Sequence, residues 1–325
     1  MKRTWVFIGW ICLAMTAMAA DTEYTLPEQE LIEQARRILR EAPLIDGHND
    51  TPWQYRKRLN NRLSGMDLAA DLSQLEPPMQ TDIARLRQGG VGAQFWSVYV
   101  PATFRGPDGV YMVVEQIDMT KRIVDRYADT FELAFSADDI VRIHKAGKIG
   151  SLIGMEGGHS MGNSLAALRQ LYALGARYMT LTHSLNIDWA DSGTDEPFVG
   201  GLSDFGEEVV REMNRLGMMV DLSHVHPETM HDAIDVSAAP VIFSHSSAYA
   251  VTPHPRNVPD DVLERLPKSD GVVMVTFLSN YVNEGFMPYV DEYRVELDRL
   301  RSQYPDDEAL VEEAMDAWKT AHPAP

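Results

Sequence analysis

Short apolar segments typical of β-strands alternate with amphipathic segments typical of helices along most of this 325-residue chain. Residues 164–174 show the helical pattern, with apolar side chains three and four apart and Gly175 placed to end the helix. The pattern returns from Asp204, the expected N-cap, to Gly217. Strands that alternate with helices of this length form parallel βαβ units. Seven strands are predicted, at residues 44–50, 91–100, 149–155, 177–182, 218–223, 240–244 and 271–277.

Seven parallel strands at this spacing fit an α/β barrel that lacks one strand, or an open doubly wound sheet. The glycine pattern G-x-G-x-x-G, which binds dinucleotides, does not follow the first strand. We therefore predict a (β/α)8 TIM-type barrel. Its eighth strand is missing from the prediction, because the sequence after Phe277 is mostly polar, acidic and helix-like.

The first twenty residues have the pattern of an export signal. Lys2 and Arg3 precede an uncharged stretch over residues 5–15, and Ala17-Met18-Ala19 fits the small-x-small cleavage rule. The stretch is shorter than the roughly 20 apolar residues that span a bilayer. We expect a signal peptide over 1–19, export to the periplasm or the cell exterior, and no membrane span after cleavage. One barrel domain is expected over residues 20–325, with its core at 44–277.

Charge and cysteine content limit the ligands of the chain. The 48 acidic and 29 basic residues give a net charge of −19. Such a chain repels phosphate backbones, so nucleic acid is not an expected partner. A single Cys excludes both an intrachain disulfide and a metal cage of thiolates. Any metal ion must therefore be held by histidines and carboxylates.

Histidine, aspartate or glutamate follows five of the predicted strands, in LIDGHND, GMEGG, LTHS, DLSH and FSHS. In α/β barrels the C-terminal ends of the strands meet at one mouth, where the chemistry takes place. His48 and Asp50 are two residues apart, a spacing that turns both side chains to the same side of a strand. Four further side chains would approach them from neighbouring strands, namely Glu156, His183, His224 and His245.

Each of these residues also has a simpler interpretation, as a cap, a surface residue or a satisfied core histidine. Glu156 is harder to explain in that way, because a carboxylate at the end of a buried strand is costly unless it is paired or bound to a cation. Imidazoles and carboxylates around one cavity suit zinc better than manganese or iron. A glutamate that bridges two ions about 3.5–4 Å apart would make a two-metal hydrolase site, with hydroxide available near neutral pH. Arg256 could be a solvated surface residue, or it could bind a substrate carboxylate with two hydrogen bonds.

With these residues in place, the chain resembles the membrane (renal) dipeptidase family of binuclear zinc peptidases. The resemblance covers about residues 44–277. It rests on four stretches, LIDGHNDTP, SLIGMEGGHSMGNSLAALRQLYALGARYMTLTHS, GLSDFGEEVVREMNRLGMMVDLSH and PVIFSHSSAYAVTPHPRNVPDD. It implies a barrel of the metal-dependent hydrolase type with two Zn²⁺ ions. It also implies hydrolysis of dipeptides, including those with a C-terminal D-residue, by a hydroxide that bridges the two ions.

The resemblance also implies a role for each candidate residue. One zinc ion would be held by His48, Asp50 and Glu156, and the other by Glu156, His224 and His245, so that Glu156 bridges them. His183 would contact the substrate and support the tetrahedral intermediate, and Arg256 would receive the substrate's carboxylate. The partners implied are small dipeptides, with a homodimer left open.

The sequence departs from the family after Phe277. Family members continue into an eighth strand that ends in a G-S-D-F-D-G-like motif, whose first Asp transfers a proton, and this sequence has no such motif. General acid–base help typically contributes about 10²–10⁴ in rate. We therefore expect a C-terminally truncated dipeptidase and keep two alternatives open. One is an exported metal-binding barrel that is catalytically impaired, and the other is a binuclear amidohydrolase acting on lactams or other cyclic amides.

Overall fold

The computed structural model describes residues 28–305 and 307–324. The signal peptide expected at residues 1–19 lies outside the described residues and stays a prediction. The chain divides into two compact units, residues 1–38 and 39–325. The described residues of the first unit belong to helix α1 (Glu28–Glu41). Among the described residues, no helix has the length and apolar character needed to cross a membrane.

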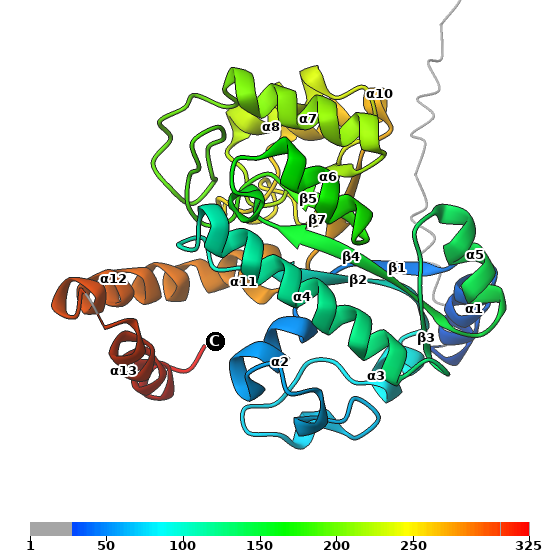
Figure 1. The fold of residues 1–325 in the computed structure, drawn as a ribbon. Coiled ribbons are helices and arrows are strands. Elements are labelled where there is room, and N and C mark those ends of the chain that lie inside the picture. The colour runs from blue at the N-terminus through cyan, green and yellow to red at the C-terminus, as the bar shows by residue number, and fades with distance from the viewer. Residues whose placement is uncertain (1–27, 306, 325) are drawn as a thin grey trace, which may run out of the picture. The chain divides into compact units, whose positions relative to one another are not determined.

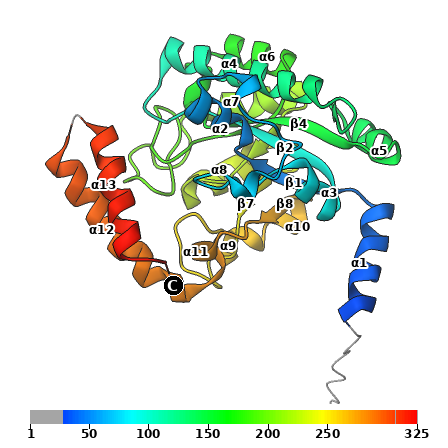
Figure 2. The ribbon, with the colours of Figure 1, turned by 90° about the horizontal axis from the view of Figure 1, so that it is seen from below.

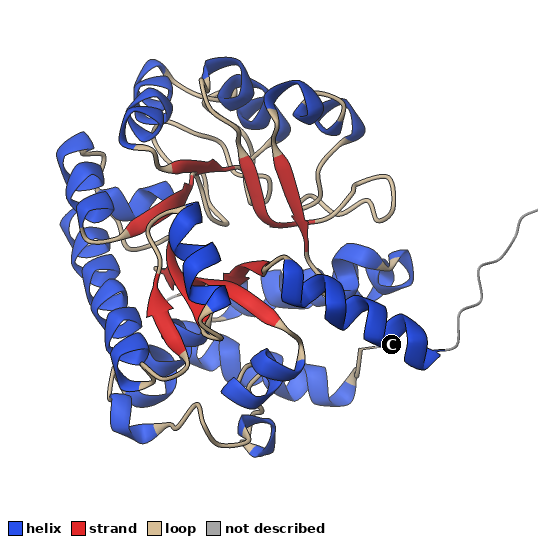
Figure 3. Cartoon of the chain, turned by 90° about the vertical axis from the view of Figure 1, so that its right-hand side faces the viewer, coloured by secondary structure: helices blue, strands red, loops and turns tan. Residues whose placement is uncertain are grey.

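The second unit consists of parallel strands with helices packed outside them (Figures 1 and 3). The strands are β1 (Leu44–Asn49), β2 (Val91–Tyr99), β3 (Phe131–Leu133), β4 (Ile149–Glu156), β5 (Ala176–Thr180), β6 (Met219–Asp221), β7 (Ile242–Ser246) and β8 (Val272–Val275). The helices before β6 are α2 (Thr51–Leu59), α3 (Ile83–Gln88), α4 (Gly106–Arg126), α5 (Ala137–Lys145), α6 (Leu165–Ala173) and α7 (Asp204–Leu216). Those after it are α8 (Pro227–Val236), α9 (Asp260–Leu263), α10 (Leu266–Ser269), α11 (Ser279–Val282), α12 (Met287–Gln303) and α13 (Glu308–Ala321).

The sheet follows the order β1-β2-β4-β5-β6-β7-β8, with every neighbouring pair parallel. All seven predicted strands are present, and they form a nearly closed barrel, which confirms the TIM-type fold. The remaining strand, β3, pairs with the first residues of β4 on the side that β5 occupies farther along. The sequence pattern does not predict β3, because three residues are too few to show an alternation.

β1 and β8 form the two ends of the sheet, and we call the place where they meet the seam. No ladder of hydrogen bonds joins β1 to β8 in the part of the chain that the structure describes. The strands are instead in van der Waals contact around Gly47. A Cβ at Gly47 would collide with the carbonyl oxygen of Ser244 on β7 and with Sδ of Met274 on β8. Glycine at position 47 therefore lets the barrel approach closure without its last ladder.

The opposite side of the barrel is a continuous, buried ladder, and we call β4–β7 the arc. Every residue of β4 is buried, as expected of a parallel strand covered on both faces. Gly154 leaves room for the ring of Tyr178, which would collide with a Cβ there. Register places Glu156 of β4 beside Thr180 of β5, and Thr180 beside Asp221 of β6. The polar ends of these strands therefore lie side by side.

Serine side chains cap the N-termini of two of the predicted helices and fix where these helices begin. Ser164 caps α6, since its Oγ accepts a hydrogen bond from the Ala167 N–H at 3.2 Å. The expected cap of α7 was wrong by one residue: Ser203 accepts from the Gly206 N–H at 3.3 Å, and Asp204 is the first helical residue. An acidic side chain in the first turn favours the helix through its dipole.

Farther along, α12 and α13 lie side by side (Figure 2) and bury Leu300, Val311 and Met315 between them.

Candidate metal centre

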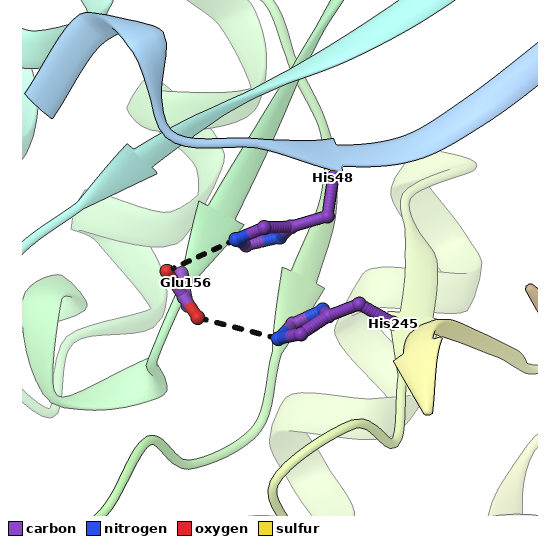
Figure 4. Close-up of side chains that lie close together, drawn as sticks. All are labelled: His48, Glu156 and His245. Atoms are coloured by element: carbon purple, nitrogen blue, oxygen red, sulfur yellow. Dashed lines mark ion pairs between the residues drawn. The ribbon is translucent and has the colours of Figure 1, made fainter. Parts of the chain in front are cut away.

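Side chains from the ends of four strands, β1, β5, β6 and β7, converge on Glu156, the last residue of β4. Its carboxylate is buried, with 5% of the side chain exposed. Four imidazole Nε2 atoms surround it, at 3.5 Å for His48, 3.6 Å for His183, 3.0 Å for His224 and 3.4 Å for His245. Figure 4 shows the rings of His48 and His245 pointing toward the two oxygens of Glu156. The structure therefore brings together the glutamate and all four histidines that the sequence analysis singled out.

The two oxygens of Glu156 face different partners. Oε2 lies 3.5 Å from His48 Nε2, and Asp50 Oδ1 is in turn 3.4 Å from the same nitrogen. Oε1 faces the other three imidazoles. Two groups of three could each hold an ion: His48, Glu156 and His245 form one, and Glu156, His183 and His224 form the other. Glu156 belongs to both groups, which is the position of a bridging ligand. The assignment of each remaining residue to one of two ions stays a prediction.

The protonation of these groups follows from burial and mutual charge. Burial alone would raise the pKa of Glu156, but the surrounding imidazoles outweigh it and hold that pKa well below the usual range. Burial lowers the pKa of His245 to about 4 and that of His224 well below its ordinary value. His48 differs: burial opposes its charge, but the carboxylate of Glu156 outweighs burial and raises the pKa of His48 well above its ordinary value. Neutral imidazoles with a free nitrogen lone pair are the form that binds metal ions, so an ion at His48 would have to displace a proton.

The donor set fits a divalent cation. His224 Nε2 and His245 Nε2 lie 3.0 Å from each other and share Oε1 of Glu156 as a neighbour. When both imidazoles present a lone pair, these three atoms repel one another unless a cation lies among them, and their closeness is therefore suited to a shared ion. Nitrogen and oxygen ligands without thiolates suit zinc. The residues present therefore fit the metal ions that the sequence analysis implied.

The loop between β5 and α7 ties two of these histidines together through their backbones. His224 has a φ of +72°, a left-handed conformation that costs on the order of 1–3 kcal/mol in residues other than glycine. The carbonyl of His224 accepts a hydrogen bond from the Gly193 N–H at 2.7 Å. Next to it, the Ser192 hydroxyl donates to the carbonyl of His183 at 2.6 Å. These two contacts hold the strained backbone so that both rings face Glu156.

Arg256 lies in the same cavity as the cluster. The cavity has a volume of about 780 Å³ and extends from Glu156 and His245 to the seam residues Met274 and Val275. Arg256 is only 4% exposed, yet its Nε and Nη1 atoms have no hydrogen-bond partner among the described residues. A buried guanidinium without a counter-ion is costly unless an anion completes it. The structure thus places Arg256 where it could bind a carboxylate next to the candidate metal ligands.

Sequence reasoning missed several residues of the site. Ser97 on β2 donates a hydrogen bond to Glu156 Oε2 at 3.0 Å. Tyr99, two residues on, packs its ring 4.9 Å from that of His183. Tyr178 donates to the carbonyl of Gly47 at 3.1 Å and lies 3.2 Å from His48 Nδ1. The sequence pattern that predicts the site consists of titratable residues at strand ends, so it does not indicate hydroxyl groups that lie within apolar strands. The period of two along β2, which puts Ser97 and Tyr99 on one face, could have indicated them.

Comparisons with known proteins agree with this geometry. The model of the membrane dipeptidase family (peptidase family M19) matches residues 32–320. A metallopeptidase from Rhodobacter sphaeroides, solved with a phosphinate mimic of the dipeptide L-Ala-D-Ala, is 25% identical, with a TM-score of 0.64 over 74% of this chain and 76% of its own. An amidohydrolase from Pseudomonas aeruginosa is 25% identical, with a TM-score of 0.61 over 77% of this chain and 67% of its own. A further metallopeptidase, dipeptidase AC, is 26% identical, with a TM-score of 0.63 over 74% of each chain.

Proposed function

This chain belongs to the membrane dipeptidase family, peptidase family M19, and on that premise we propose that it is a dipeptidase that uses two zinc ions. The observation that carries the proposal is the buried guanidinium of Arg256 in the cavity of the His/Glu cluster, whose Nε and Nη1 atoms have no hydrogen-bond partner among the described residues. A dipeptide has its carboxylate one residue from its only peptide bond, so a cavity that offers both a cation and a metal cluster fits it. The dipeptide mimic bound by the Rhodobacter sphaeroides enzyme supports this substrate class and a D-residue at the C-terminal side.

The residues of the chain would share the work as follows. Zinc ions held by the cluster would lower the pKa of water and polarise the scissile carbonyl. Arg256 binds the substrate's carboxylate through two hydrogen bonds. Burial lowers the pKa of His183, so its imidazole is neutral and can donate a hydrogen bond to the oxygen that gains negative charge. Asp46 and Asp50 line the same cavity and make its mouth attractive to the substrate's ammonium group.

The test is hydrolysis by the purified, zinc-loaded chain. L-Ala-D-Ala and L-Ala-L-Ala should be cleaved, a tripeptide should not, and Glu156→Ala should abolish the activity. A lactam belongs in the same series, because one structural neighbour is described as an amidohydrolase. Cleavage of the tripeptide or the lactam in preference to both dipeptides would contradict the proposed substrate class.

The carboxylates of the cavity suggest a second candidate function. The described residues that line it include three, and each is already engaged: Asp46 accepts from the His48 N–H at 2.9 Å, Asp50 lies beside His48, and Glu156 is surrounded by imidazoles. Among the described lining residues, no carboxylate stands apart from His48 and Glu156 as a separate proton-transferring acid. A metal-binding barrel with little turnover is therefore the alternative. Two bound ions without hydrolysis of any dipeptide would favour it.

We also propose that the chain is exported. The support is the charged start, apolar stretch and Ala17-Met18-Ala19 of the first residues. Expression of the full chain in a bacterium should release a protein into the periplasm that begins at Ala20. A protein that keeps Met1 and stays in the cytoplasm would contradict this.

A further inference from the structure

The end of β6 carries a carboxylate that the proposed mechanism does not use. Asp221 is fully buried and accepts four hydrogen bonds. Its Oδ2 accepts from the hydroxyls of Thr180 at 2.5 Å and Ser244 at 2.6 Å. Its Oδ1 accepts from the backbone N–H groups of Ser223 at 3.1 Å and Ser244 at 2.8 Å. Such a carboxylate is held rigidly between β5, β6 and β7.

One of these hydroxyls links Asp221 to the candidate metal centre. The Oγ atom of Ser244 lies 2.8 Å from Nδ1 of His245. A serine hydroxyl has a single hydrogen, and here it is donated to Asp221. Ser244 can then only accept at His245, so the hydrogen of this contact belongs to His245 Nδ1. The Nε2 atom of His245 is left with its lone pair free, 3.4 Å from Glu156.

The other imidazoles of the centre are supported differently. His48 Nδ1 lies near the Tyr178 hydroxyl, whose hydrogen goes to the carbonyl of Gly47. His224 Nδ1 is buried and has no hydrogen-bond partner among the described residues. His245 thus differs from these two imidazoles, because the hydroxyl of Ser244 connects its Nδ1 atom to the carboxylate of Asp221. A carboxylate behind a ligating histidine fixes the tautomer and the ring orientation and makes the nitrogen a better ligand.

We infer that Asp221, acting through Ser244, is a positioning residue that holds His245 in the form that binds a metal ion. The inference deepens the proposed function and rests on it, since it concerns affinity for the ion that His245 would hold. In this role neither Asp221 nor Ser244 acts as a ligand of the ion. Their effect is to keep the Nε2 lone pair of His245 directed at the centre before any ion arrives.

Two substitutions separate this role from a purely structural one, because each removes one hydroxyl that donates a hydrogen bond to Asp221. Ser244→Ala removes the link to His245, whereas Thr180→Val removes the matching hydroxyl on β5, which the structure does not connect to a histidine. Zinc affinity is measured by competition with a chromophoric chelator, and unfolding of the metal-free proteins by urea. Ser244→Ala should weaken the binding of one ion by about 10–100-fold. Thr180→Val should lose comparable stability and keep the affinity of the unaltered chain. Ser244→Thr, which keeps the hydroxyl, should restore the affinity.

Other results would overturn the inference. Unchanged affinity in Ser244→Ala, or an equal loss in Thr180→Val, would show that Ser244 only supports the fold. If Ser244→Ala does not fold, nitrogen NMR of the unaltered, metal-free chain decides: His245 should carry its hydrogen on Nδ1, and a hydrogen on Nε2 would contradict the inference. Absence of zinc binding by the unaltered chain would instead overturn the proposed function, and this inference with it.

Discussion

The arc and the seam both supply ligands to the same centre, but they are built differently. In the arc, β4 is buried along its whole length, and Glu156, Thr180 and Asp221 follow one another across hydrogen-bonded strands. In the seam, Val272 is 50% and Val275 56% exposed. Glu156 and His224 therefore come from strands that have ladders on both sides. β1, which carries His48, has a ladder only on its β2 side, and its other edge is held by the close contact at Gly47. We therefore expect the truncation of an apolar side chain to cost more stability in the arc than in the seam.

The largest difference between the two regions should be in unfolding free energy, when one side chain is truncated in each. Phe243 on β7 is fully buried, so Phe243→Ala should cost about 3–5 kcal/mol of unfolding free energy. Val275→Ala at the exposed seam should stay within about 0.5 kcal/mol. Urea unfolding of both variants in a chelator measures the difference. Equal costs would mean that the seam is packed as tightly as the arc.

A substitution at Arg256 tests the function of the cavity that residues of the arc and of the seam line together. Arg256→Lys keeps the charge but loses the paired hydrogen bonds, each worth about 1.5–3 kcal/mol when charge-assisted. We expect kcat/KM for a dipeptide to fall by about 10–100-fold, mainly through KM. A dipeptide amide, which lacks the carboxylate, is the control and should lose little. An equal loss with the amide would show that Arg256 does not bind the carboxylate.

Gly47 tests the contact that closes the seam. Gly47→Ala places a Cβ against Ser244 and Met274, so β1 must move, and overpacking of this kind costs about 1–3 kcal/mol. Because His48 is the next residue, zinc affinity should fall as well. Gly150→Ala in β4 is the matched control, since its Cβ would meet its nearest neighbour at an ordinary 3.4 Å. Should Gly47→Ala bind zinc as tightly as Gly150→Ala, the seam would not position His48.

The smallest expected effect lies on the outer layer of the arc. Hydrogen bonds from Arg215 on α7 and then from Arg169 on α6 lower the pKa of Glu212 to about 2. Because the folded-state pKa lies below the ordinary value, Glu212 stabilises the fold at neutral pH, and this contribution disappears as the pH falls toward 2. Glu212→Gln should cost less than about 1 kcal/mol at pH 7. Stability curves of the variant and the unaltered chain should converge in acid, and a constant gap would contradict the pKa assignment.

The sequence was a good guide where long apolar strands end in charged residues. Continuous apolar runs such as that of β4 can only be buried strands or helices, and Glu156 at such an end stands out. The register of parallel strands then brings residues as distant as His48 and His245 together. This follows from topology and needs no knowledge of the side-chain contacts.

Contacts that depend on single hydroxyls could not be predicted in this way. Asp221 read as an ordinary strand end, because nothing in the sequence shows that Thr180 and Ser244 donate to it. The left-handed backbone of His224 depends on hydrogen bonds from a loop with no periodic pattern. Such features arise from tertiary packing, and only coordinates reveal them.

The most direct test of the account is the metal content of two proteins, the unaltered chain and Glu156→Gln, after zinc loading and removal of free metal. If Glu156 bridges two ions between arc and seam, the unaltered chain should hold about two zinc ions and the variant about one or none. Two ions retained in Glu156→Gln, or fewer than two in the unaltered chain, would contradict the shared centre.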